Sequence, residues 1–94
     1  MAVKVKIRYL AVLRGLSDEP EREQTIKGKS LRSLIETLRR SEKAPLKARL
    51  FTDTSVRPDV LIFINDAEAD LLGGPKAELK DGDEVTFLPS VHGG

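Results

Sequence analysis

One short stretch, residues 31–38, limits the fold of this chain more than any other part of the sequence. Its apolar residues recur at the i, i+3, i+4, i+7 spacing that gathers side chains on one helix face: Leu31, Leu34, Ile35 and Leu38. Ser30 precedes them and is a favoured N-cap, because its hydroxyl can accept a hydrogen bond from a free N–H of the first turn. An apolar helix face must be covered by a second layer, which the other residues have to supply.

The first half of the chain supplies two strand patterns. Apolar and basic residues alternate through residues 3–9, which predicts a strand with one buried face and with Lys4, Lys6 and Arg8 on the other. We expect this basic stripe to be a solvated strand face. Residues 21–27 are mostly polar and predict an edge strand, antiparallel to the first, whose charges discourage edge-to-edge aggregation.

The second half supplies two more strands. Residues 60–64 are apolar throughout, with β-branched and aromatic side chains, and they predict a buried strand with Phe63 in the core. Residues 84–89 predict the last strand, in which Thr86 and Leu88 face outward because side chains alternate along a strand.

Smaller elements connect these strands. Residues 44–52 predict a short second helix, and residues 67–72 predict either a short strand or a single turn. Residues 81–83, Asp-Gly-Asp, predict a tight turn rather than a metal site, because two carboxylates without other ligands bind cations poorly. Three further carboxylates predict a solvated acidic edge: Asp66, Glu68 and Asp70.

The order of these elements predicts an α+β fold in which one main helix lies across one face of a mixed sheet of four to five strands. We expect the first and last strands to lie parallel at its centre, since the helix supplies part of the long crossover that parallel pairing needs. Residues 1–89 then form one domain, and residues 90–94 form a flexible tail.

The composition excludes several classes of function. Cysteine is absent, which excludes disulfides and thiolate nucleophiles, and a single histidine makes a catalytic triad or a histidine metal site implausible. Sixteen basic and fifteen acidic residues nearly balance, so we expect no direct binding to nucleic acid. The longest apolar run is too short to span a membrane. We therefore expect a cytoplasmic protein without a bound metal.

The sequence ends in two glycines, Gly93 and Gly94. Because they lack a Cβ, their backbone can pass a constriction that any side chain would block. Such a tail can carry a carboxylate into the active site of a partner, where adenylation by ATP exposes the Gly94 carbonyl carbon to a nucleophile. Judged on the glycines alone, an ordinary frayed chain end is an equal alternative.

A longer set of motifs resembles the ubiquitin-related modifier family of eukaryotes and archaea. The match runs through residues 56–67 (VRPDVLIFINDA), 71–74 (LLGG) and 79–85 (LKDGDEV), and it ends at residues 92–94 (HGG). The first half of the chain agrees with the family in layout only. The turn, last strand, proline and final glycines also resemble, more distantly, the small subunit of molybdopterin synthase and the sulfur carrier of thiamine synthesis.

The resemblance implies a β-grasp, ubiquitin-like fold and a carrier protein rather than an enzyme. In this family an E1-like enzyme uses Mg-ATP to adenylate the terminal glycine, and sulfur from a persulfide then converts the carboxylate to a thiocarboxylate. The sulfur is passed to the tRNA thiolation machinery, or the activated terminus is joined to lysines of target proteins. By position, the activated residue is Gly94, and Gly93 and His92 thread the tail into the activating enzyme. A solvated tail histidine is the alternative for His92.

A docking surface for that enzyme is expected at the root of the tail, where three apolar residues cluster: Leu88, Pro89 and Val91. Isolated apolar residues on a surface are also common, and that interpretation stays open. Two alternative functions remain as well. The chain can be the small, sulfur-carrying subunit of molybdopterin synthase, or a β-grasp interaction domain that is never conjugated.

Overall fold

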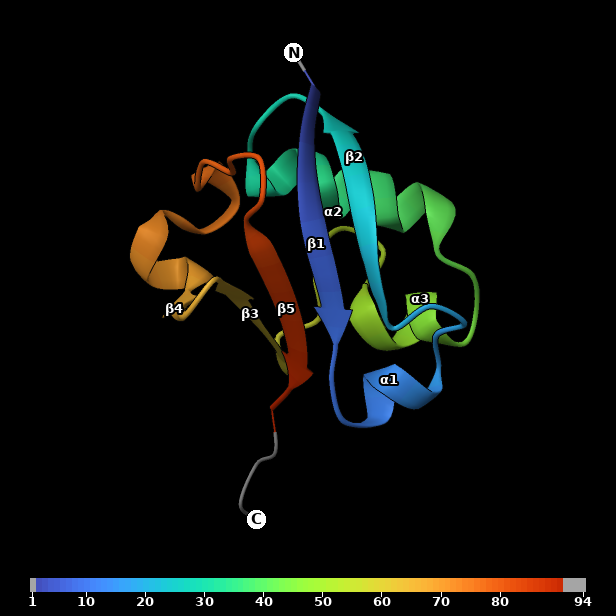
Figure 1. Cartoon of the computed structure of the whole chain (residues 1–94). Coiled ribbons are helices and arrows are strands. Elements are labelled where there is room, and N and C mark those ends of the chain that lie inside the picture. The colour runs from blue at the N-terminus through green and yellow to red at the C-terminus, as the bar shows by residue number, and fades with distance from the viewer. Residues whose placement is uncertain (1, 91–94) are drawn as a thin grey trace.

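The structure is a computed structural model, and it describes residues 2–90. Five strands form one mixed sheet in the order β2-β1-β5-β3-β4 (Figure 1). The strands are β1 (Ala2–Tyr9), β2 (Glu21–Lys27), β3 (Val60–Ile64), β4 (Ala67–Glu68) and β5 (Glu84–Pro89). The α-helices are α1 (Val12–Gly15), α2 (Leu31–Ser41) and α3 (Leu46–Leu50), and two 3₁₀ turns follow β4, η1 (Ala69–Leu72) and η2 (Gly74–Lys76).

The expected sheet arrangement is confirmed. Strand β1 pairs antiparallel with β2 and parallel with β5, so the first and last strands lie side by side inside the sheet. Strand β3 pairs antiparallel with the other side of β5 over its whole length, and with β4 only at Phe63 and Ile64. The short contact with β4 leaves most of the outer edge of β3 without a strand beside it.

Helix α2 crosses one face of the sheet, behind β1 and β2 in the view of Figure 1. Its N-cap is Ser30, whose hydroxyl accepts a hydrogen bond from the Ser33 N–H at 3.2 Å, as the sequence predicts. The predicted apolar face is buried at Leu31, Leu34 and Leu38, whereas Ile35 is only partly covered. The helix is thus capped and packed as expected, but one edge of its apolar face is open.

The core lies between this helix and the sheet, and Phe63 is not part of it. The core residues of β1 and β5 are Val5, Ile7, Tyr9, Val85 and Phe87. Phe63 pairs with Thr86, which alternates with Val85 and Phe87 along β5, so Phe63 lies on the opposite face and is half-buried. The prediction of a core Phe63 was therefore wrong. An unbroken apolar strand has residues on both faces, and the run of residues 60–64 does not show which face is covered.

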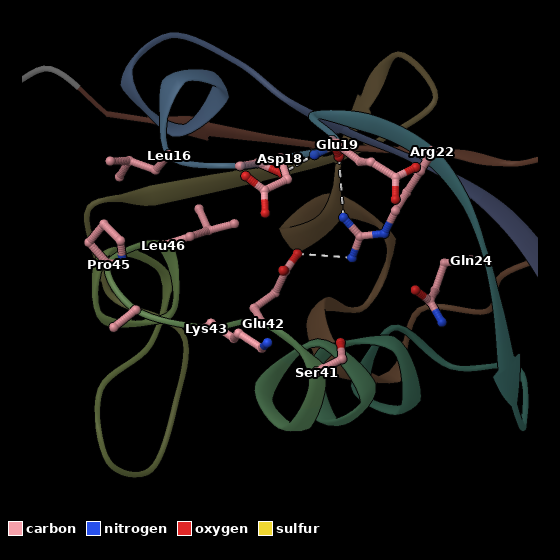
Figure 2. A pocket seen from close by; sticks show the side chains of 12 residues that line it. Leu16, Asp18, Glu19, Arg22, Gln24, Ser41, Glu42, Lys43, Pro45 and Leu46 are labelled. Carbon is pink, nitrogen blue, oxygen red and sulfur yellow. Dashed lines mark hydrogen bonds and ion pairs between the residues drawn. The ribbon is translucent and has the colours of Figure 1, made fainter.

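Three polar side chains, Tyr9, Arg22 and Glu42, connect the end of α2 to β1 and β2, and we call this cluster the joint. Glu42, the C-cap of α2, accepts hydrogen bonds from the Tyr9 hydroxyl at 2.5 Å and from Arg22 Nη2 at 2.9 Å. Figure 2 shows Arg22 and Glu42 facing each other. Burial raises the pKa of Tyr9 most, and the hydrogen bond to Glu42 and its negative charge raise it further.

The connecting segments agree with the sequence in part. The expected helix within residues 44–52 is confirmed as α3, with Leu46, Leu50 and Phe51 buried. Residues 67–72 contain both of the predicted alternatives, because β4 runs directly into η1. Residues 11–19 showed no clear period, and the structure forms one helical turn there, α1, with Leu13 buried.

The core assignment predicts that Leu34→Ala lowers the free energy of unfolding by about 2–5 kcal/mol, because Leu34 is fully buried and the surrounding residues cannot fill the cavity. Urea unfolding measures this quantity. Glu36→Ala, at an exposed position of the same helix, is the control and should change it by less than about 0.5 kcal/mol. Equal stability of the two variants would show that α2 does not cover the sheet.

The joint predicts a loss of stability at alkaline pH. Tyr9 is the one tyrosine of the chain, and its pKa is raised in the folded state above the ordinary value of 10.0. Above that pH the unfolded chain releases the phenol proton while the folded chain retains it, so stability falls as pH rises. We expect tyrosinate absorbance to appear together with unfolding. Its appearance at pH 10.0 in a protein that stays folded would contradict the buried joint.

Candidate functional site

The tail residues named from the sequence lie outside the described residues. They are Val91, His92, Gly93 and Gly94. Their roles, and the division between residues 1–89 and 90–94, stay predictions. The structure does describe the root of the tail, because β5 ends at Pro89 and Ser90 follows it.

The root of the tail is tied to the residue that precedes β3. Pro89 pairs with Val60, and the Ser90 N–H donates to the Asp59 carbonyl at 2.7 Å. The bond continues the β3–β5 ladder beyond the last residue of β5. Strand β5 therefore ends between β1 and β3 (Figure 1), and a backbone hydrogen bond holds the residue that follows it.

Two arginines bind the side chain of Asp59. Asp59 Oδ1 accepts from Arg49 Nη1 at 3.2 Å and from Arg57 Nε at 3.3 Å. Loss of solvation raises the pKa of Asp59, but the charges of Arg49 and Arg57 outweigh it and hold the pKa below its ordinary value. The carboxylate thereby joins α3 to the loop before β3, and its main chain holds the tail. No local pattern in the sequence indicates this contact, because its members are brought together only by the fold.

An apolar patch lies beside the root, on the face of the sheet opposite α2. Leu61 pairs with Leu88, and Phe63 lies two residues further along β3 on the same face. All three side chains are half-buried. We call Leu61, Phe63 and Leu88 the outer patch. The expected outward position of Leu88 is thus confirmed, and alternation along the apolar run was the available signal for Leu61 and Phe63.

Pro89 does not share this exposure. It lies on the opposite side of the strand from Leu88 and is buried. The expectation that Leu88, Pro89 and Val91 form an exposed cluster was wrong for Pro89, since alternation along β5 turns it towards the helix-covered face. Its predicted contact with a partner remains untested. Thr86 is on the outward side as predicted, but neighbouring side chains cover it and leave only 8% of it exposed.

The basic stripe on β1 is neutralised within the sheet. Each of its three members forms ion pairs with glutamates of the neighbouring strands, at 3.4–4.0 Å. The pairs join Lys4 to Glu23, Lys6 to Glu21 and Glu84, and Arg8 to Glu21 and Glu84. This face therefore offers alternating charge, rather than the uncompensated positive surface that a nucleic acid requires.

The Asp-Gly-Asp segment is a turn, as predicted. Gly82 has a φ of +88°, a left-handed conformation that suits glycine. Asp81 Oδ1 accepts from the Lys4 N–H at 2.8 Å, and Asp83 Oδ2 accepts from the Lys80 N–H at 2.9 Å. These carboxylates are thus used to hold the turn. Among residues 2–90, no three histidine or acidic side chains are grouped closely enough to hold a metal ion.

A polar hollow of about 490 Å³ opens at the end of α2, between β2 and the start of α3 (Figure 2). Its charged wall includes Arg22 and Glu42, which are engaged with each other and with Tyr9. Ser17 and Ser41 also line it, and the Ser17 hydroxyl accepts a hydrogen bond from the Glu19 N–H at 3.1 Å. Within residues 2–90, no helix has the length and apolar content required to cross a membrane.

Comparison with solved structures identifies the fold. A protein titled small archaeal modifier protein 1, from Methanosarcina acetivorans, superimposes with a TM-score of 0.85 at 28% identity, over 100% of this chain and 99% of its own. A chain of the BexX/CysO complex of Amycolatopsis orientalis superimposes with a TM-score of 0.70 at 31% identity, over 96% of this chain and 99% of its own. The fold is therefore a ubiquitin-like β-grasp, as the resemblance implied.

Sequence comparison gives the family. Ubiquitin-related modifier 1 of Ajellomyces capsulatus is 36% identical over 66 residues, which is 69% of this chain. The aligned part spans 54% of that relative, so the match covers about half of its length. The family model described as Urm1 (Ubiquitin related modifier) matches residues 4–94. The chain therefore belongs to the ubiquitin-related modifier family.

Proposed function

We propose that this chain is a ubiquitin-like modifier and sulfur carrier, a protein on which partner enzymes act. The observation that carries the proposal is the root of the tail, where Ser90 is anchored to Asp59 and the outer patch lies alongside. Membership of the ubiquitin-related modifier family supports the same function.

The proposed chemistry takes place at Gly94. A carboxylate oxygen attacks the α-phosphorus of Mg-ATP in an E1-like enzyme, and pyrophosphate leaves. A persulfide sulfur then attacks the carbonyl carbon, and AMP leaves with the oxygen that it had bonded. A second thiol of the enzyme then attacks the enzyme-side sulfur of this acyl disulfide; the S–S bond breaks, the thiocarboxylate leaves, and the two enzyme sulfurs are oxidised to a disulfide. Attack by a lysine amine of a target protein on the activated carbonyl gives an isopeptide bond instead.

The described residues would contribute position rather than catalysis. Gly94 is four positions beyond Ser90, and an extended chain covers at most about 3.6 Å per residue, so Gly94 reaches about 14 Å from Ser90 at most. An enzyme that holds Gly94 must then contact the surface around Ser90. The outer patch is the apolar part of that surface, and burial of apolar side chains is what gives an interface most of its binding energy.

The acceptors of the sulfur and of the modifier are part of the proposal. We assign the sulfur to the tRNA thiolation machinery and the isopeptide bond to lysines of target proteins, in the cytoplasm, where ATP and tRNA meet. Transfer to a pterin precursor by a molybdopterin synthase is the alternative acceptor. Stable co-purification with a large synthase subunit would favour that alternative over tRNA thiolation.

The tail chemistry predicts that Gly94→Ala lowers the rate of adenylation by the E1-like enzyme of the same cells by about 100-fold, because a methyl group displaces the carboxylate by about 1 Å in a channel fitted to bare backbone. ATP–pyrophosphate exchange measures the rate. Gly15→Ala is the matched control, since a Cβ on Gly15 meets nothing within 4 Å. Undiminished exchange by the Gly94 variant would count against activation at this residue.

The docking surface predicts that Phe63→Ala raises the KM for the activating enzyme by about tenfold or more, because a large apolar contact is lost at the interface. The maximal rate should stay within about twofold, since the patch touches no reacting atom. Thr25→Ala, on the same face but on the exposed edge strand β2, is the control and should leave KM unchanged. An unchanged KM for Phe63→Ala would remove the outer patch from the proposed interface.

A further inference from the structure

Leu71 is the most exposed large apolar side chain that the structure describes, with 81% of its surface accessible to solvent. It lies in the turn η1, whose first residue, Ala69, is buried and holds the turn against the body of the protein. The residue before Leu71 is an exposed carboxylate, Asp70. A partner that covers this turn must therefore offer an apolar hollow that carries positive charge.

The chain itself contains an apolar hollow of about 680 Å³, between α2 and the loop at residues 54–56. Its apolar side chains are Ile35, Val56 and Pro75. Ile35 is the residue at which the apolar face of α2 is left partly open, and Val56 is likewise only partly buried. The hollow thus brings together, at one place, apolar surface from α2, from the loop before β3 and from η2.

The charge of this hollow, which we call the basic hollow, is mainly positive. Arg32 and Arg39 line it together with one carboxylate, Glu36. Neither arginine forms an ion pair with any of the described residues. Arg39 is oriented by the fold, because its Nη1 donates to the Thr52 carbonyl at 2.7 Å and its Cζ lies 4.9 Å from the centre of the Phe51 ring. An arginine held in this way loses little entropy when it binds a carboxylate.

A second, smaller hollow of about 220 Å³ has the opposite charge, and we call it the acidic hollow. Glu68 and Asp70 line it, and in the part of the chain that the structure describes neither forms an ion pair. Arg57 also lines it, but its guanidinium is paired with Asp59 at 3.3 Å. The acidic hollow therefore keeps a net negative charge.

The two hollows share one apolar ridge. Ile35, Val56 and Pro75 line both of them, so these three side chains separate the acidic side of the face from the basic side. A two-fold axis through such a ridge places the acidic side of one copy on the basic side of the other. The face is thus complementary to itself in charge, with apolar surface at its centre.

We propose that this face binds a second copy of the chain and forms a symmetric dimer. Leu71 of each copy enters the basic hollow of the other, and the neighbouring Asp70 meets Arg32 and Arg39 there. Both copies play the same role across a two-fold axis, so association stops at two chains. The face lies on the α2 side of the sheet and the outer patch on the opposite side, so the dimer leaves the outer patch accessible.

Sedimentation equilibrium of the full chain tests the association. Between about 10 µM and about 1 mM, we expect the average mass to rise towards twice that of the monomer, because a small interface gives a weak equilibrium. Leu71→Ala should weaken dimerisation by about tenfold, since each copy loses its most exposed apolar contact. Val12→Ala, at a site on α1 that is 53% exposed, is the control and should leave dimerisation unchanged. A chain that stays monomeric at about 1 mM, or equal weakening by the two variants, would overturn the proposal.

Exchange of charge tests the orientation of the two copies. Arg32→Glu alone and Asp70→Arg alone should each weaken dimerisation by about tenfold, because each brings like charges together at both contacts. An equimolar mixture of these two variants should recover the association of the unaltered chain, since opposite charges then meet at both contacts. Arg40→Glu makes the same change of charge at an exposed position of α2 outside both hollows and should dimerise normally. A mixture that fails to recover, or a loss with Arg40→Glu as large as with Arg32→Glu, would contradict the proposed dimer.

Discussion

The parallel pairing of β1 with β5 is the interaction on which the rest of the structure depends. It places the two ends of the described chain in neighbouring strands, and it is possible only because the segments between them, with α2 as the largest, cross over the sheet. The same pairing sets the buried contact of Tyr9 with Phe87, and it leaves the other side of β5 free to pair with β3. Because β5 is internal, the tail begins from a strand that is held on both sides rather than from a loose edge.

The position of β5 at the centre of the sheet determines both which face is packed against α2 and where the tail begins. Covering one face with α2 leaves the other face open along β3 and β5, and there the outer patch lies next to the tail root. Asp59 is where the two meet, since its main chain holds Ser90 while its side chain is held by Arg49 and Arg57. The tail's point of departure is thus fixed by the body of the protein, which is what a carrier needs if an enzyme is to find its terminus by docking on a rigid surface.

Periodicity in the sequence was enough to predict the strands, the capped helix and the parallel centre of the sheet, because these depend on local patterns such as Leu31, Leu34 and Leu38. Periodicity was not enough where tertiary contacts determine which face of a strand is buried. Phe63 belongs to a run that is apolar on both faces, and Pro89 was placed with Leu88 although neighbours in a strand face opposite ways. The Asp59 anchor depends on Arg49 and Ser90, which are not sequence neighbours of Asp59, so no local pattern could have indicated it.

The central claim is that Gly94 carries activated sulfur, and the most direct test is the intact mass of the protein isolated from its native cells, with fragmentation to locate any change. The account predicts a fraction whose mass matches replacement of one oxygen by sulfur, located at Gly94. That fraction should disappear when a residue is added after Gly94, because the carboxylate then no longer reaches the adenylating site. A terminus that is never altered, with no adducts joined through Gly94 to lysines of other proteins, would contradict the account.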